Sequence, residues 1–187
     1  MIVLASGSPR RGEILANAGI PFVRNVPSNI DETPMPAEAP RDYVVRLASE
    51  KARAVTASQG QIVLGADTAV VIEGEILGKP SGAGDAARML RLLSGRMHEV
   101  ITGICLRTPS RQVEDAAVTR VWFAALSSAE IDAYAGSGEP LDKAGAYGIQ
   151  GLASKFITRI DGCYFNVMGL PIALVYARLR ESAAFML

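Results

Sequence analysis

The sequence predicts an α/β fold in which helices flank a mixed central sheet. Two observations support this prediction. Short apolar runs typical of buried strands alternate along the 187 residues with segments whose apolar residues recur at helical spacing. Glycine, proline and capping residues stand between these segments, where helices and strands begin and end. Because no internal repeat or low-complexity tract divides the chain, we expect a single domain over residues 1–187.

The composition narrows the classes of function. The formal net charge is zero, with 19 basic and 19 acidic residues, which argues against a broad nucleic-acid surface. No apolar run approaches the roughly 18 residues that a membrane span needs, and the N-terminus lacks the features of a signal peptide. Cys105 and Cys163 match no metal or redox spacing, and Cys105 falls in a strand pattern typical of the core. We therefore predict a cytoplasmic protein that binds neither nucleic acid nor membrane, and a homodimer is compatible with the sequence.

The N-terminus predicts a strand that feeds the start of a helix. Met1–Ala5 is an apolar run, Ser8 is a good N-cap, and Pro9–Ala18 follows as a helix. Arg10 and Arg11 then lie in the first turn, where the helix dipole disfavours cations. Their presence is explained if an anion such as a phosphate binds at this helix terminus. The alternative is an ordinary Ser-Pro helix start with two solvated arginines.

The next segments are a short strand, a loop and a longer helix. Phe22–Val26 is apolar and extended, whereas the prolines of Asn29–Pro40 exclude a helix or a central strand there. Arg41–Ala57 carries an apolar stripe at helical spacing, and Lys51 falls in the middle of that stripe. A lysine in this position either snorkels to water or reaches a buried anion.

A strongly apolar strand over Ile62–Ala66 is predicted to end at Asp67 and Thr68. Ala69–Ile72 continues extended and turns into a hairpin over Ile76–Pro80. Asp67 would thus lie at the C-terminal end of the most buried strand, where α/β sheets bind ligands. A carboxylate in this position is costly unless it meets a cation.

The rest of the chain, more than half of its length, continues the same alternation. The predicted elements are helices over Gly84–Leu93, Ser127–Ala135 and from Pro171 onward, strands over His98–Arg107, Gln112–Ala125 and Phe156–Ile160, and a glycine-rich loop over Gly136–Gly151. His98 is the single histidine, which excludes a histidine-rich zinc site, and we expect it to be structural rather than catalytic.

Carboxylates and cations in these segments indicate a polyphosphate site. Asp67 and Glu32 supply the oxygen ligands that Mg²⁺ or Mn²⁺ prefers. Four cations stand at ends of elements or within the helical stripe, and a hydroxyl joins them: Arg10, Arg11, Lys51, Lys79 and Ser8. Each residue has an ordinary structural explanation, but together they form the set that metal-assisted phosphate chemistry uses.

All of these residues except Glu32 stand in blocks that resemble the Maf-like nucleotide pyrophosphatases, once described as septum-formation inhibitors. The blocks occur in order, span nearly the whole chain and are Ser6–Arg11, Glu50–Ala52, Leu64–Thr68, Gly78–Pro80, Leu93–Gly95 with His98, Thr102–Gly103, Asp142–Gly151 and Gly169–Pro171. The resemblance implies a fold like that of inosine triphosphatases, with a cleft between two lobes. It also implies hydrolysis of a nucleoside triphosphate to a monophosphate and pyrophosphate with a divalent metal.

The resemblance further implies roles for individual residues. Asp67 is the proton acceptor that activates water, and with Glu32 it holds the metal. The phosphate and metal region is lined by Ser8, Arg10, Arg11, Glu32, Lys51 and Lys79. Arg11, Thr68 and Gln150 match the group that acts on dTTP and UTP. An alternative function is a nucleotide-binding regulator of cell division without turnover, but such a protein would not need a base like Asp67 beside the phosphates.

Overall fold

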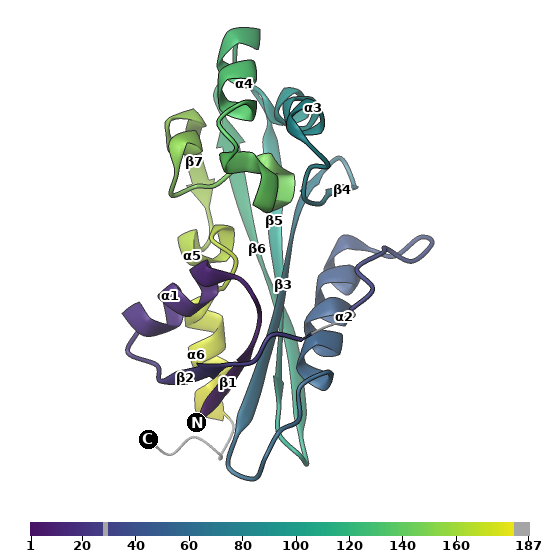
Figure 1. Ribbon diagram of the computed structural model, residues 1–187, viewed down its shortest axis with the longest axis vertical. Coiled ribbons are helices and arrows are strands. Elements are labelled where there is room, and N and C mark those ends of the chain that lie inside the picture. The colour runs from purple at the N-terminus through teal and green to yellow at the C-terminus, as the bar shows by residue number, and fades with distance from the viewer. Residues whose placement is uncertain (28–29, 182–187) are drawn as a thin grey trace. The chain divides into compact units, whose positions relative to one another are not determined.

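Helices and strands alternate along the chain in a computed structural model that describes residues 1–27 and 30–181 (Figure 1). The strands are β1 (Ile2–Ala5), β2 (Phe22–Arg24), β3 (Ile62–Ile72), β4 (Glu75–Leu77), β5 (Met97–Arg107), β6 (Gln112–Phe123) and β7 (Ile157–Asp161). The helices are α1 (Pro9–Asn17), α2 (Pro40–Arg53), α3 (Ala83–Leu93), α4 (Ser128–Ala135), α5 (Tyr164–Val167) and α6 (Ile172–Glu181). Three short 3₁₀ helices, which the sequence did not predict, are η1 (Glu139–Asp142), η2 (Ala144–Ala146) and η3 (Leu152–Phe156).

The strands of the described residues form one mixed sheet in the order β2-β1-β3-β5-β6-β7, with β4 paired to β3. β1 runs parallel to β2 and β3, whereas β4 is antiparallel to β3 and β7 is antiparallel to β6. This arrangement confirms the predicted α/β class with a mixed sheet flanked by helices. Among the described residues, no helix is both long enough and apolar enough to span a membrane.

One strand boundary differs from the prediction and concerns Asp67 directly. The sequence predicted a strand end at Asp67 and Thr68, followed by an extended segment over Ala69–Ile72 and a hairpin. The extended segment and the hairpin with β4 are confirmed, but no strand ends at Asp67, because β3 continues without a break to Ile72. The parallel pairing with β1 ends at Gly65, and the antiparallel pairing with β4 begins at Val70. Asp67 therefore lies inside a strand and just past the end of β1. The extended run continues because β4 folds back onto its second half.

The chain forms two compact units that interleave in sequence. The first unit contains residues 1–68, 102–117 and 169–187, and the second contains residues 69–101 and 118–168. β3, β5 and β6 contribute residues to both units. The cleft that the resemblance implies, and the single-domain organisation, stay predictions.

In the first unit, α2 packs closely on one face of the sheet, and Figure 1 shows α1 and α6 on the other side. The side chains packed between α2 and the sheet are small or branched. The strands contribute Val3, Ala5, Val63 and Cys105, and α2 with the residues after it contributes Ala48, Ala52 and Val55. Gly65 and Gly103 allow this approach, because a Cβ at either position would collide with a carbonyl oxygen of α2. The buried Cys105 confirms its predicted place in the core.

The first two helices of the first unit begin close to where the sequence placed them. α1 starts at Pro9 with Ser8 as the N-cap residue, although the Ser8 side chain makes no capping hydrogen bond. α2 starts at Pro40, one residue earlier than predicted, because proline suits the first helical position, and it ends at Arg53 instead of Ala57. Residues 30–39 contain no helix or strand, which confirms the predicted loop over its described part.

The second unit has its own core, formed by α3, α4, the 3₁₀ helices and the facing strands. His98 lies in this core, where its Nε2 and the Tyr147 hydroxyl are hydrogen-bonded at 2.8 Å. The His98 ring also meets Phe123 edge-on. The predicted helix at Ser127–Ala135 is confirmed as α4, and it starts with a capping box in which Ser127 and Glu130 bond each other's backbone N–H.

Candidate active site

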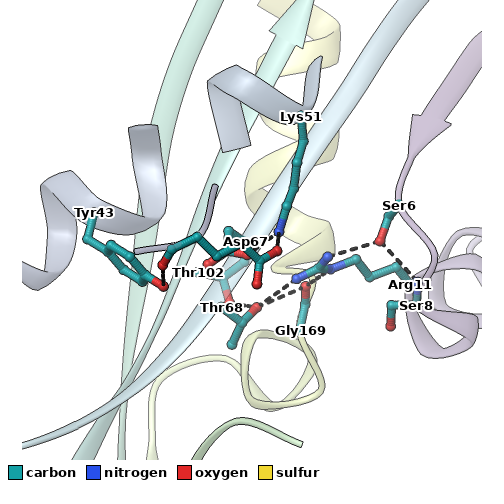
Figure 2. Close-up of polar contacts among 10 residues, drawn as sticks. Ser6, Ser8, Arg11, Tyr43, Lys51, Asp67, Thr68, Thr102 and Gly169 are labelled. Carbon is teal, nitrogen blue, oxygen red and sulfur yellow. Dashed lines mark hydrogen bonds and ion pairs between the residues drawn. The ribbon is translucent and has the colours of Figure 1, made fainter. Parts of the chain in front are cut away.

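The candidate site lies in the first unit, around two consecutive residues of β3. Successive side chains of a strand point to opposite faces of the sheet, so Asp67 and Thr68 serve different neighbours. Asp67 points to the face under α2 and meets Lys51. Thr68 points to the opposite face and meets Arg11 of α1. The strand thereby brings the side chains of two helices to one place (Figure 2).

A lysine joins two carboxylates at the centre of the site. Lys51 Nζ lies 2.5 Å from Asp67 Oδ1 and 2.6 Å from Glu32 Oε1. The Lys51 and Asp67 side chains are only 11% and 12% exposed, whereas the Glu32 side chain is 52% exposed. Lys51 thus reaches a buried anion, which is one of the two alternatives that its place on the helix left open. Of the sequence-predicted residues, Glu32 and Asp67 thus both contact Lys51, and Thr68 contacts Arg11.

Burial and neighbouring cations act on the protonation of Asp67 in opposite directions. Burial raises the pKa of the Asp67 carboxyl above its ordinary value, and the positive charges of Lys51 and Arg11 oppose that rise. The two influences act in opposite directions, as they do at many sites of proton transfer. A carboxylate that is buried but faced by cations remains available as a base and is more basic than a solvated one.

Arg11 is held on the other side of β3 by three acceptors. Its Nε donates to the Gly169 carbonyl oxygen at 2.8 Å, Nη1 to Ser6 Oγ at 3.0 Å, and Nη2 to Thr68 Oγ1 at 3.1 Å. Thr102 Oγ1 lies 3.0 Å from Thr68 Oγ1 and extends the network. Burial lowers the pKa of the Arg11 guanidinium, but an arginine remains charged in proteins. The site therefore contains a fixed positive charge next to Thr68.

The turn between β1 and α1 presents the remaining N-terminal residues. The Ser8 N–H donates to Ser6 Oγ at 3.2 Å, so the turn is closed by a side chain. Arg24 of β2 donates to the carbonyl oxygens of Gly7 and Ser8 at 3.3 and 3.1 Å and holds the outer side of the turn. Arg10 follows in the first turn of α1, as predicted.

Sequence reasoning missed several residues that contact this site. Ser6 and Thr102 bond to Arg11 and Thr68, and the Gly169 carbonyl accepts from Arg11 across 158 positions of sequence. The Tyr43 hydroxyl donates to the Glu32 carbonyl oxygen at 2.9 Å. Ser6, Thr102 and Gly169 stand in the blocks of the family resemblance, which is the one signal that could have identified them. Tyr43 had no such signal.

Glu32 and Asp67 are the carboxylates that could hold a divalent metal. One oxygen of each contacts the same cationic atom, Lys51 Nζ, so the two carboxylates lie close together around a positive charge. Within residues 1–27 and 30–181, no group of three or more acidic, histidine or cysteine side chains is placed to hold a metal ion. Mg²⁺ is commonly bound by one or two carboxylates together with substrate phosphates and water, so a pair of carboxylates suffices.

Two predicted site residues belong to the second unit. Lys79 is exposed and follows β4, and Gln150 is exposed in the turn before η3. The Gln150 turn is closed by the Gly151 N–H, which donates to the Gly148 carbonyl oxygen at 3.0 Å. Their part in the site of the first unit stays a prediction.

Comparison with known proteins identifies close relatives of the whole chain. A model of the family described as Maf-like protein matches residues 1–182. A dTTP/UTP pyrophosphatase of Anaeromyxobacter dehalogenans (strain 2CP-C) is 53% identical and aligns over 97% of this chain and 93% of its own. Proteins of the same name from Geobacter metallireducens and Koribacter versatilis are 53% and 50% identical, over 98% and 97% of this chain and 96% and 94% of theirs.

Among solved structures, the Staphylococcus aureus Ham1 protein is similar in fold. It matches with a TM-score of 0.53 and 15% sequence identity, over 96% of this chain and 98% of that one. At this level of identity the likeness concerns the fold alone. It agrees with the mixed sheet and flanking helices described above.

Proposed function

Since the chain belongs to the Maf-like protein family, we propose that it is a nucleoside triphosphate pyrophosphatase with a preference for dTTP and UTP. It would release a nucleoside monophosphate and pyrophosphate. The relatives at 50% to 53% identity that carry the name dTTP/UTP pyrophosphatase support this substrate class. The observation that carries the proposal is the pair of carboxylates, Asp67 and Glu32, held on Lys51 beside a buried arginine.

Asp67 is the proposed proton acceptor for the attacking water. Its Oδ1 accepts from Lys51, and Oδ2 has no hydrogen-bond partner among the described residues and can take the proton. The water oxygen forms a bond to the α-phosphorus as the bond from that phosphorus to the bridging oxygen breaks. The proton moves to Asp67, and the electron pair of the broken bond leaves with pyrophosphate. Holding the water and the phosphorus in line provides much of the acceleration.

Glu32 and Asp67 would hold the divalent cation, Mg²⁺ or Mn²⁺. When bound, such a cation neutralises charge on phosphate oxygens during the displacement. Lys51 orients both carboxylates, so their oxygens face the same position before the substrate arrives. The α1 terminus with Ser8 and Arg10, together with Lys79 of the second unit, is proposed to bind the phosphates and the leaving pyrophosphate.

Gln150, Thr68 and Arg11 are the proposed determinants of base selectivity. A primary amide offers one donor group and one acceptor, which match the N3–H and a carbonyl oxygen of uracil or thymine. Cytosine presents a different pattern, so an amide held in the orientation that suits uracil or thymine would not pair with it. Thr68 is held by Arg11 and Thr102 and keeps a fixed hydroxyl beside Asp67.

A substrate panel tests this proposal. Pyrophosphate release would be measured for dTTP, UTP, CTP, dATP, GTP and 7-methyl-GTP with Mg²⁺ or Mn²⁺, and the Asp67→Asn variant would serve as the control. We expect dTTP and UTP to give the highest kcat/KM, and we expect the variant to lose roughly 10²–10⁴-fold or more. Faster hydrolysis of 7-methyl-GTP would contradict the base preference, and near-normal turnover by Asp67→Asn would remove Asp67 from the mechanism.

The same samples distinguish the enzyme from the alternative function, a nucleotide-binding regulator (a nucleotide sensor) without turnover. Nucleotide binding would be measured by calorimetry alongside pyrophosphate release. Tight binding of dTTP without release under any metal condition would contradict the enzyme and support the sensor. The cytoplasmic location, the homodimer and the absence of a nucleic-acid partner stay predictions.

A further inference from the structure

The loop that carries Glu32 is attached to α2 by side chains outside the carboxylate pair. Residues 30–39 form no helix or strand, and the Glu32 side chain is half exposed. A surface loop of this kind is mobile unless its backbone is bonded to a rigid element. Glu32 nevertheless meets Lys51 at 2.6 Å. Something must therefore hold the backbone at this position.

Two side chains of α2 bond the loop backbone at Glu32 and at the next residue, Thr33. The Tyr43 hydroxyl donates to the Glu32 carbonyl oxygen at 2.9 Å, and Arg46 Nη2 donates to the Thr33 carbonyl oxygen at 3.2 Å. Tyr43 is buried, and burial raises the pKa of its hydroxyl to about 12. The hydroxyl is therefore protonated at neutral pH and can donate this hydrogen bond. Two successive carbonyl groups of the loop are thus tied to one helix.

Glu38, near the C-terminal end of the loop, pairs with the same arginine, Arg46. Arg46 Nε donates to Glu38 Oε1 at 2.6 Å and Nη2 donates to Oε2 at 2.8 Å, a two-point pairing of a planar guanidinium with a carboxylate. The Met35 N–H also donates to Glu38 Oε2 at 3.0 Å. The Glu38 and Arg46 side chains are only 8% and 18% exposed. This pairing is therefore more shielded than an ordinary surface ion pair.

Tyr43, Arg46 and Lys51 all belong to α2, so one rigid helix positions both the lysine and the loop that meets it. Tyr43 and Arg46 are three residues apart and therefore project toward the same side of the helix, and Lys51, about two turns beyond Tyr43, contacts the same loop through Glu32. We propose that Tyr43, Arg46 and Glu38 are positioning residues that hold Glu32 at Lys51 before the substrate binds. This inference rests on the proposed function, because it assigns Glu32 a role in the reaction.

A double-mutant analysis tests whether these residues act through Glu32. Tyr43→Phe and Arg46→Ala would be measured alone and in combination with Glu32→Gln. Alone, each should lower kcat/KM, by roughly 10–100-fold for Arg46→Ala, the range seen when the support of a ligating group is lost. Added to Glu32→Gln, each should change kcat/KM by less than about 2-fold, because residues acting through one partner are not additive. An equal loss in both backgrounds would overturn the inference.

Hydrogen exchange supplies a measurement that does not depend on activity. In the free protein, Arg46→Ala should speed exchange of the Thr33 and Met35 amides while the amides of α2 keep their wild-type rates. Arg41→Ala is the matched control, since Arg41 lies on the same helix but bonds Asp115 and the Ala116 carbonyl oxygen instead of the loop. The control should leave both loop exchange and kcat/KM unchanged. Wild-type exchange in Arg46→Ala would overturn the inference.

The two measurements also separate this inference from the proposed function. If the wild-type protein released pyrophosphate from none of the nucleotides, the proposed function would fail. The exchange rates would still decide whether α2 holds the loop. If the wild-type protein is active and Arg46→Ala is additive with Glu32→Gln, the function stands and the positioning role does not.

Discussion

At the scale of single residues, the structure decides between the two alternatives that the sequence left open for Lys51. A lysine on an apolar helical stripe either extends to water or meets a buried anion, and Lys51 meets Asp67 at 2.5 Å. The same ammonium contacts Glu32, so one cation orients two carboxylates. A buried carboxylate that has lost its cation is strongly disfavoured as an anion. Lys51 therefore influences both the charge state of Asp67 and the orientation of its carboxylate.

Lys51→Met keeps the unbranched stem and removes the charge. We expect kcat/KM for dTTP to fall at least about 10²-fold, because a preorganised charge at the reacting centre is lost. Activity would be measured well below the melting temperature of each variant. Arg53→Met is the control on the same helix, since Arg53 is exposed and bonds Gln112. A folded Lys51→Met protein with wild-type turnover would show that Lys51 is only a packing residue.

Gln150→Glu tests the proposed recognition of the base. Replacing the amide by a carboxylate removes the donor and adds a negative charge, so the match to uracil and thymine is lost. We expect the ratio of kcat/KM for dTTP to that for CTP to fall at least about tenfold, which corresponds to one misplaced hydrogen bond. Both substrates would be measured in the same preparation. An unchanged ratio would exclude Gln150 as a selectivity residue.

At the scale of elements, the contact of α2 with the sheet determines where Lys51 lies. Gly65 on β3 stands against the backbone of α2, and a Cβ there would collide with the Ala48 carbonyl oxygen and crowd Ala52. The helix has no flexible side chain to move aside at this contact. Any side chain at position 65 must therefore push α2 away from the strand that carries Asp67.

Gly65→Ala should consequently destabilise the protein and reduce activity together. We expect the free energy of unfolding to fall by about 1–3 kcal/mol, the usual cost of overpacking a core. Gly84→Ala is the control, because a Cβ at Gly84 in α3 meets no atom within 4 Å and alanine favours helix. Urea unfolding of both variants would measure the difference. Wild-type stability of Gly65→Ala would mean that α2 can shift without cost.

At the scale of the whole molecule, the sole histidine makes stability depend on pH. His98 is 1% exposed, and burial lowers its pKa from 6.5 to about 4. The unfolded chain takes up a proton near pH 6.5, whereas the folded chain resists protonation until about pH 4. The unfolded state thus binds more protons within this window, and stability falls as the pH falls through it.

We expect the loss of stability from His98 to approach roughly 3 kcal/mol when the pH has fallen to about 4, at 1.36 kcal/mol per pKa unit. Urea unfolding at pH 7, 6 and 5 would compare the wild type with His98→Gln, which retains a side-chain amide that can bond the Tyr147 hydroxyl. The slope between pH 7 and 5 should be shallower in the variant. Because His98 is the single histidine, NMR would also follow it directly, and a folded-state pKa near 6.5 would contradict the prediction.

Much of the fold and several site residues could be predicted from local sequence patterns. The Ser-Pro start of α1, the prolines before α2, the capping box at Ser127 and the apolar strands are properties of neighbouring residues. Helix and strand periodicity, together with capping chemistry, depend on positions within about four residues of one another, which the sequence displays directly. The matching blocks along the chain likewise indicated the Maf-like family, which the comparison confirmed.

Only the tertiary structure decided how these residues meet. The continuation of β3 past Asp67 depends on the return of β4, and the Arg11 network requires Gly169 from the far end of the chain. The attachment of the Glu32 loop depends on which side of α2 faces it. The side-chain hydrogen bonds of the Arg11 network and of the Glu32 loop join residues up to 158 positions apart, and no local period encodes them. The sequence therefore determined the elements and the chemical groups, while packing determined which groups share a site.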